Sequence, residues 1–200
     1  MPPPAARIRS SLMPNDSSTD PVDIVLITGP AGIGKSTLSW EVGARLTAAG
    51  LAHAIVETDE LDRVYPRPSR ADLERLRPGT LDISTLNLAA IWATYRALGH
   101  RRLIMSGVMV HLDFDRRWIL AAIPDARITV VRLQASGTTL TERLIQREIG
   151  SGLDAQLERT LTQAQRMAGE AENGAIRLET DGRSPQELAR LLLAELGWVR

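Results

Sequence analysis

Eight residues from Gly29 to Ser36 read Gly-Pro-Ala-Gly-Ile-Gly-Lys-Ser and carry glycine, lysine and serine at the spacing of a phosphate-binding loop. Glycines let a backbone curl around an anion, so that successive N–H groups point inward. A helix that follows directly points the positive end of its dipole at the same anion. The segment predicts a polyphosphate site, and a glycine-rich turn without a ligand is the alternative. The residues expected to contact the polyphosphate are Gly29, Pro30, Ala31, Gly32, Ile33, Gly34, Lys35, Ser36 and Thr37.

Lys35 is the only lysine of the chain, although lysine and arginine together number 24. A compact ammonium fits among phosphate oxygens better than a planar guanidinium does. Lys35 is therefore expected to reach the β- and γ-phosphates, and the Ser36 hydroxyl is expected to bind Mg²⁺. A single lysine within this loop also excludes the Asn-Lys-x-Asp motif with which GTPases recognise their base.

The elements that must position this loop alternate between strand and helix patterns. Apolar runs predict strands at 22–28, 52–58, 101–107, 127–133 and 175–180. Helical spacing and capping signals predict helices from the loop to Gly50, from Asp82 to Leu98, from a Thr139–Glu142 capping box to Ile149, from a cap at Asp154 through Ala168, and from Ser184 to Gly197. Strands separated by helices imply parallel pairing, so a ligand is expected at the carboxyl ends of the strands.

The composition fits one α/β domain over 22–200, preceded by a tail at 1–21 that is predicted to be disordered. The formal net charge of zero gives no reason to expect nucleic acid or an anionic membrane as a partner. No apolar run approaches the ~20 residues of a membrane-spanning helix. The absence of cysteine excludes disulfides and thiolate zinc sites, and it fits a cytoplasmic protein.

Four segments together resemble the small P-loop kinases, the group of the nucleoside monophosphate, gluconate, shikimate, adenylylsulfate and chloramphenicol kinases. They are the loop itself, the acidic strand end at 55–62, the arginine-bearing helix at 141–148 and the strand-to-helix turn at 180–187. The resemblance implies an α/β fold of the P-loop NTPase type, a three-layer sandwich with a five-stranded parallel sheet in the order 2-3-1-4-5 and a short helical lid. It also implies ATP and Mg²⁺ as cofactors, and it places Arg183 beside the adenine.

Asp59 follows the predicted second strand, near the expected position of the γ-phosphate. In similar kinases an acid here accepts the proton of the substrate hydroxyl or helps to hold Mg²⁺, and the resemblance offers either role, or both, to Asp59. A solvated turn acid or a helix cap is the alternative, and Glu57 and Asp62 are weaker candidates. Strand 101–107 ends without the aspartate that P-loop enzymes use as a second metal acid. Either Asp59 takes that role, or Mg²⁺ is held by Ser36, phosphate oxygens and water.

Arg143 and Arg147 lie four residues apart on a predicted helix and can face the same side. Their helix runs into Gly150–Gly152, which looks like a lid hinge. In similar kinases such arginines clamp the transferring phosphoryl group with their planar forks. A pair of surface arginines is the alternative.

The resemblance predicts a kinase that moves the γ-phosphoryl group of ATP to a hydroxyl of a small molecule, as a monomer or homodimer. The acceptor pocket is expected within about 60–118, where Trp92 and Tyr95 are expected to pack in a helix interface. The polar candidates there are Arg63, Arg67, Asn87 and His111. One rival is an ATP-binding switch or adaptor that acts through a protein partner, which the missing strand-end aspartate favours. A nucleic-acid end kinase is the other rival, and zero net charge argues against it.

Overall fold

The computed structural model describes residues 21–80, 82–147, 153–169 and 174–199. The predicted tail, apart from Pro21, and the Gly150–Gly152 break lie outside the described residues. The strands are β1 (Val22–Thr28), β2 (Ala54–Glu57), β3 (Arg102–Gly107), β4 (Ala126–Gln134) and β5 (Ile176–Glu179). The helices are α1 (Lys35–Ala48), α2 (Arg70–Leu76), α3 (Ile83–Ala97), α4 (Leu112–Ala122), α5 (Gly137–Arg147), α6 (Leu153–Gly169) and α7 (Pro185–Leu196), with a short 3-10 turn, η1 (Thr58–Glu60), after β2.

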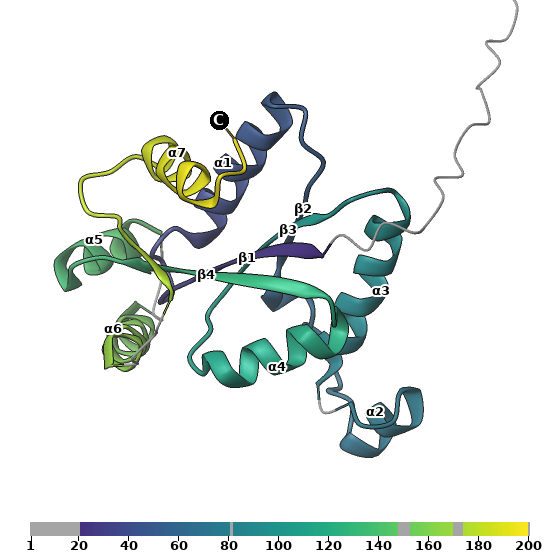
Figure 1. The fold of residues 1–200 in the computed structure, drawn as a ribbon. Helices are drawn as coiled ribbons and strands as arrows, with labels where there is room; N and C mark the ends of the chain where they lie inside the picture. The colour runs from purple at the N-terminus through teal and green to yellow at the C-terminus, as the bar shows by residue number, and fades with distance from the viewer. Residues whose placement is uncertain (1–20, 81, 148–152, 170–173, 200) are drawn as a thin grey trace, which may run out of the picture.

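The strands form a five-stranded parallel sheet in the order β2-β3-β1-β4-β5, which confirms the predicted topology. Thr28 at the end of β1 pairs with Gly107 of β3 and with Arg132 of β4, so the three central strands end at the same edge. Figure 1 shows α1 and α7 on one face of the sheet and α3 and α4 on the other. The chain therefore has the three predicted layers, and the loop after β1 lies at the carboxyl edge of the sheet.

The side chains of β1 alternate between two apolar cores. Ile24 and Leu26 pack with residues of α3 and α4, whereas Val25 and Ile27 pack with residues of α1 and α7. Because helices cover both faces of the sheet, β1 at its centre is apolar at most of its positions. The buried strand fixes the start of the glycine-rich loop. Among the helices of the described ranges, none combines the length and apolar character needed to cross a membrane.

The capping signals predicted for the last helix are confirmed in α7. The Ser184 hydroxyl accepts the N–H of Glu187, and the Glu187 carboxylate accepts the N–H of Ser184. Pro185 is the first helical residue, where its missing N–H costs nothing. Gly197 ends the helix in the left-handed conformation, at φ 63°. Local sequence thus determined both ends of this helix.

The predicted start of α5 is wrong, and α4 was not predicted. α5 begins at Gly137, because the Ser136 hydroxyl accepts the N–H of Thr139 at 3.2 Å and thereby caps the helix. Thr139 is therefore inside the helix rather than its cap. α4 carries several charged residues between its buried Leu112 and Trp118, and these obscure its apolar face in the sequence.

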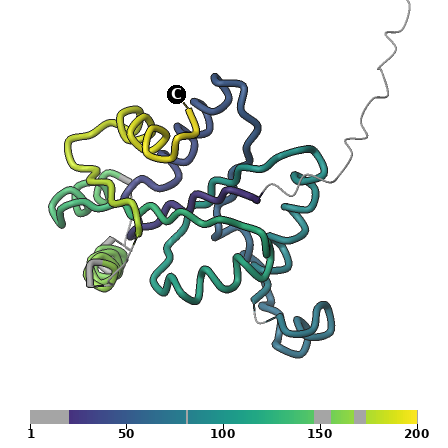
Figure 2. Tube along the Cα trace, viewed as in Figure 1, coloured from purple at the N-terminus to yellow at the C-terminus, as the bar shows by residue number. Residues whose placement is uncertain are grey.

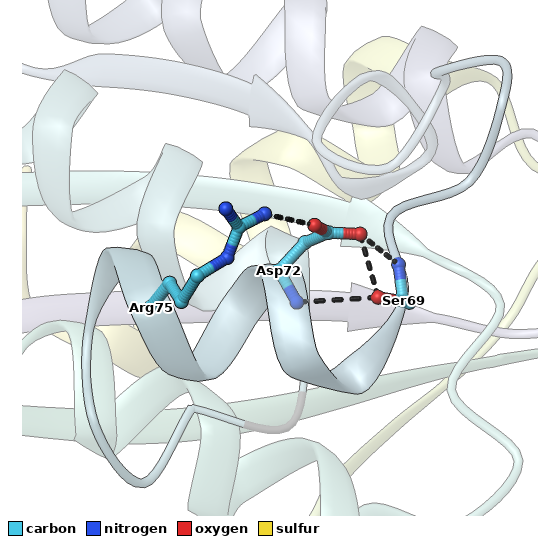
Figure 3. Close-up of polar contacts among 3 residues, drawn as sticks. All are labelled: Ser69, Asp72 and Arg75. Carbon is cyan, nitrogen blue, oxygen red and sulfur yellow. Dashed lines mark hydrogen bonds and ion pairs between the residues drawn. The ribbon is translucent and has the colours of Figure 1, made fainter.

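A short helix, α2, projects from the layers of the sheet (Figure 2). The Ser69 hydroxyl accepts the N–H of Asp72 at 3.2 Å, and the Asp72 carboxylate accepts the N–H of Ser69 at 3.0 Å (Figure 3). Arg75 pairs with the other oxygen of this carboxylate. The hydrogen bonds from Ser69, and then the contact with Arg75, hold the pKa of Asp72 below its usual value. Local polar contacts therefore maintain this helix, although little of it is buried.

Candidate nucleotide-binding site

The loop between β1 and α1 is curled, as a phosphate-binding loop requires. Gly29, Gly32 and Gly34 have φ angles of 154°, 75° and 105°, in the region that favours glycine. α1 begins at Lys35, directly after Gly34, so its first amides and the positive end of its dipole adjoin the loop. The motif therefore adopts the conformation expected from its glycines.

Lys35 reaches back across this loop. Its Nζ donates to the carbonyl of Gly29 at 3.1 Å and to the carbonyl of Pro30 at 3.0 Å. The ammonium is thus held among backbone groups at the carboxyl edge of the sheet. Ser36 follows in the first turn of α1 and is half-buried, whereas Thr37 is exposed. The positive charge, the helix terminus and a hydroxyl lie together in one segment, an arrangement that can bind a phosphate with its cation.

The Arg143 guanidinium links the loop to the turn between β5 and α7. It donates to the carbonyl of Ile33 at 3.0 Å, to the hydroxyl of Thr180 at 2.9 Å and to the carbonyl of Thr180 at 3.2 Å. The structure therefore shows Arg143 holding the loop from α5. Its predicted contact with the transferring phosphoryl group stays a prediction. The side chain of Arg147 lies outside the described part of the structure.

The β5–α7 turn is also tied to the start of α5. Asp181 accepts the N–H of Ser136 at 3.0 Å, and this hydrogen bond is the main reason that the pKa of Asp181 lies below its usual value. Arg183 is exposed in the same turn, and its N–H donates to the carbonyl of Thr180 at 3.3 Å. The turn predicted to lie beside the adenine is thus fixed relative to the loop by Arg143 and to α5 by Asp181.

Asp59 lies in η1, on a turn that is anchored on both sides. Before it, the Thr58 hydroxyl donates to the carbonyl of Ser106 at the end of β3, at 3.2 Å. After it, Leu61 is only 2% exposed, and its carbonyl accepts a hydrogen bond from the Asn87 amide at 2.7 Å. The Asp59 carboxylate itself is exposed and has no hydrogen bond or ion pair with the residues described. A carboxylate presented in this way can accept a proton or bind a cation.

Oxygen groups suited to Mg²⁺ gather at the ends of β2 and β3. Glu57 and Ser106 are register partners, and both lie on the face toward α1, because the residues two positions earlier pack in the core on that side. The Ser106 hydroxyl is buried and has no hydrogen-bond partner among the residues described. In the same part of the chain, no three His, Cys, Asp or Glu side chains form a metal cluster. Serine hydroxyls and a carboxylate are oxygen ligands that Mg²⁺ accepts together with phosphate oxygens and water, so the residue types at these strand ends and in the first turn of α1 fit this cation.

The acceptor candidates are divided between the core and the surface. Trp92 is buried and Tyr95 packs against the same core, which confirms the expected helix interface. Arg63 and Arg67 are exposed, and each pairs with an acid of its own segment, at 3.1 and 2.8 Å. His111 is exposed and directly precedes α4.

A cavity of about 440 Å³ lies between α4 and the connection from α2 to α3, within the region predicted for the acceptor. Phe114 and Trp118 line it together with Arg77 and Arg117. Its volume is in the range of small-molecule sites. Its lining includes neither the loop residues nor Asp59, so it is separate from the phosphate site.

A contact from α6 to the loop was missed by the sequence prediction. The N–H of Ala31 donates to Oε1 of Gln163 at 3.3 Å. The two residues are 132 positions apart, and neither spacing nor composition marks Gln163 as a loop contact. The Ser106 hydroxyl was missed for a similar reason, since only the observed register shows which face of the sheet it occupies.

The fold and the loop together define the class: the chain has the fold of the P-loop small-molecule kinases. The tunicamycin resistance protein of Deinococcus radiodurans matches with a TM-score of 0.58 and 19% identity, over 88% of this chain and 96% of that one. A gluconokinase from Sinorhizobium meliloti 1021 matches with a TM-score of 0.54 and 22% identity, over 89% and 93% of the two chains. The APS kinase of Mycobacterium tuberculosis, in complex with AMPPNP and APS, matches with a TM-score of 0.53 and 19% identity, over 88% and 98%. No protein-family model and no curated protein matches the sequence.

Proposed function

We propose that this chain is an ATP-dependent kinase that transfers the γ-phosphoryl group of ATP to a hydroxyl of a small molecule. The observation that carries the proposal is the curled loop, in which the Lys35 ammonium lies 3.0 and 3.1 Å from two loop carbonyls beside the start of α1. The likeness in fold to a gluconokinase and an APS kinase supports it. Since the proposed donor is ATP, we expect the protein to act in the cytoplasm, as a monomer or homodimer.

In the proposed reaction, loop amides and Lys35 hold the β- and γ-phosphates. The acceptor hydroxyl approaches the γ-phosphorus, and its proton passes to the Asp59 carboxylate. A bond forms between the acceptor oxygen and phosphorus, the bond to the β–γ bridging oxygen breaks, and ADP leaves. Asp59 suits this role because its turn is anchored through Thr58 and Leu61 while its carboxylate stays exposed. Arg147 is proposed to join Lys35 in balancing the charge of the transferred group.

Mg²⁺ would be held by the hydroxyls of Ser36 and Ser106 and by a carboxylate, with Asp59 as the proposed ligand and Glu57 as the nearby alternative. When bound, the cation would neutralise charge on the phosphate oxygens. The residues of this chain then have to orient the acceptor and exclude water, because phosphoryl transfer requires little covalent chemistry from the protein.

A second candidate function is an ATP-binding switch or adaptor that hydrolyses ATP slowly and acts through a protein partner. The observation that favours it is Ser106, which occupies the end of β3 where P-loop enzymes usually have an acid. The likeness in fold to a gluconokinase and an APS kinase favours the kinase instead. We do not expect nucleic acid or a membrane as a partner, given the formal net charge of zero.

The test is a panel of metabolites and antibiotics incubated with the full chain and ATP·Mg²⁺, with phosphate addition measured by mass spectrometry. Lys35→Ala is expected to abolish transfer. Asp59→Asn is expected to lower turnover by about 10²-fold or more. An unchanged Kd for ATP·Mg²⁺ in this variant would assign Asp59 the role of base alone, and a weaker Kd would assign it a role in binding the cation as well. Glu60→Gln is the matched control, since Glu60 is the exposed neighbouring acid and pairs with Arg63. Steady ADP release without any phosphorylated product would favour the switch, and full turnover by Asp59→Asn would remove its role as base.

A further inference from the structure

The contact between α6 and the loop involves the peptide unit between Pro30 and Ala31. The Pro30 carbonyl accepts a hydrogen bond from Lys35 Nζ at 3.0 Å, while the adjoining N–H of Ala31 donates to Gln163 Oε1 at 3.3 Å. The carbonyl and the N–H of a trans peptide point in opposite directions. The ammonium and the Gln163 carboxamide therefore flank the same peptide group. The lysine of such a loop reaches the β- and γ-phosphates, so Gln163 lies one peptide unit away from the ammonium that is expected to hold the terminal phosphate.

The position of Gln163 is set by the packing of α6. Thr160, Ala164 and Met167 lie on the same side of this helix as Gln163, at helical spacing. Thr160 and Met167 are buried, and Ala164 packs against the core beneath α1. The buried Arg132 at the end of β4 donates to the carbonyl of Met167 at 2.9 Å. α6 is thus fixed to the sheet, and Gln163 is held against the loop independently of its own weak hydrogen bond.

Space also remains between α6 and the loop. A small cavity of about 90 Å³ is lined by Pro30 and Ile33 of the loop and by Ala164 and Met167 of α6. α6 therefore packs against the loop without filling all of the space between them.

The chemistry of the carboxamide suits an anion. A glutamine has one acceptor oxygen and two N–H donors on its nitrogen. Oε1 is used by Ala31, whereas the Gln163 nitrogen has no partner among the residues described. Two donors close to the expected terminal phosphate can bind oxygens that ATP has and ADP lacks. A carboxylate of the same shape could still accept the Ala31 N–H but would repel those oxygens.

We propose that Gln163 recognises the γ-phosphate and makes the loop prefer a nucleoside triphosphate over a diphosphate. This inference rests on the proposed function, since it needs a nucleotide in the loop. Gln163 acts in it as a binding residue for the donor, a role distinct from that of Arg143, which contacts the loop through a backbone carbonyl.

The experiment measures the Kd of the full chain for ADP·Mg²⁺ and for a non-hydrolysable ATP analogue with Mg²⁺ by calorimetry. Gln163→Glu is expected to weaken analogue binding by about tenfold or more and to change ADP binding by less than about twofold. Gln163→Ala is expected to weaken analogue binding by about threefold to tenfold, again with little effect on ADP. Gln165→Glu is the matched control, because Gln165 is exposed on the same helix and gains the same charge; neither Kd should change.

Comparing the Kd values for the two ligands distinguishes the possible explanations. Equal loss of both affinities in Gln163→Glu would show that Gln163 only supports the loop, and it would overturn the inference. Unchanged affinities for both ligands would overturn it as well. Binding of neither ligand by the unaltered chain, or binding that survives Lys35→Ala, would instead overturn the proposed function. Because ADP binding reports on folding within each variant, a selective loss of the analogue cannot arise from misfolding.

Discussion

Replacing Gly107 by alanine tests whether the turn that carries Asp59 is set by contact with the end of β3. A Cβ at 107 would lie 1.9 Å from Thr58 Oγ1 and 3.1 Å from Thr58 Cβ. No real Cβ tolerates the shorter distance, so the Thr58 hydroxyl must move and its 3.2 Å hydrogen bond to the Ser106 carbonyl must break. The backbone at Gly107 has no positive φ, so crowding alone makes alanine unfavourable.

The expected cost follows from these two effects. Overpacking of this kind costs about 1–3 kcal/mol, and a lost hydrogen bond costs about 1 kcal/mol. Gly107→Ala should therefore lower the free energy of unfolding by about 2–4 kcal/mol, which corresponds to a fall in Tm of roughly 5–15 °C. Chemical denaturation followed by circular dichroism measures the first quantity, and calorimetry measures the second.

A double-mutant cycle shows whether Thr58 is the cause. Thr58→Ala alone should cost about 1 kcal/mol, because it removes the hydrogen bond to Ser106. In the double variant the clash is gone, so the total cost should be smaller than the sum of the single costs by at least about 1 kcal/mol. Gly137→Ala is the control, since a Cβ there meets nothing closer than 3.9 Å. Additive costs, or a cost of Gly107→Ala below about 0.5 kcal/mol, would refute the reasoning.

Two further predictions concern the connections around the loop. Arg143→Ala should weaken ADP and ATP binding equally, by about five- to twentyfold, because it removes hydrogen bonds to Ile33 and Thr180 that hold the loop for either nucleotide. Calorimetry on both ligands measures this, and a loss confined to ATP would indicate a direct phosphate contact instead. The Ser136 N–H holds the pKa of Asp181 below its usual value, so the carboxylate stabilises the fold above about pH 4, and this contribution is lost as the pH falls through the lowered pKa. The difference in unfolding free energy between the natural chain and Asp181→Asn should therefore be constant above pH 5 and shrink below pH 4; a difference that grows on acidification would contradict this assignment.

Local features of the sequence were sufficient to predict the loop, the strands and the last helix. Gly29, Gly32 and Gly34 permit a curled backbone that other residues resist. Lys35 directly follows Gly34 in the sequence, so its place at the loop does not depend on contacts with distant segments. The β1 run and the cap at Ser184 are likewise short-range signals, in which hydrophobic burial or one hydrogen bond decides the outcome. The order of the strands was predicted differently, from the resemblance to a family that these motifs carry.

Contacts between distant segments determined the features that the sequence did not predict. The start of α5 depends on the Ser136 hydroxyl, whose residue is held by Asp181 from another turn, so the nearer threonine signal was misleading. The position of Arg143 on the Ile33 carbonyl and of Gln163 on the Ala31 N–H depends on how α5 and α6 pack against the sheet. Residue types and spacing along a chain determine which local conformations are favourable. Which side chains reach the phosphate site depends on packing, and packing is a property of the whole fold.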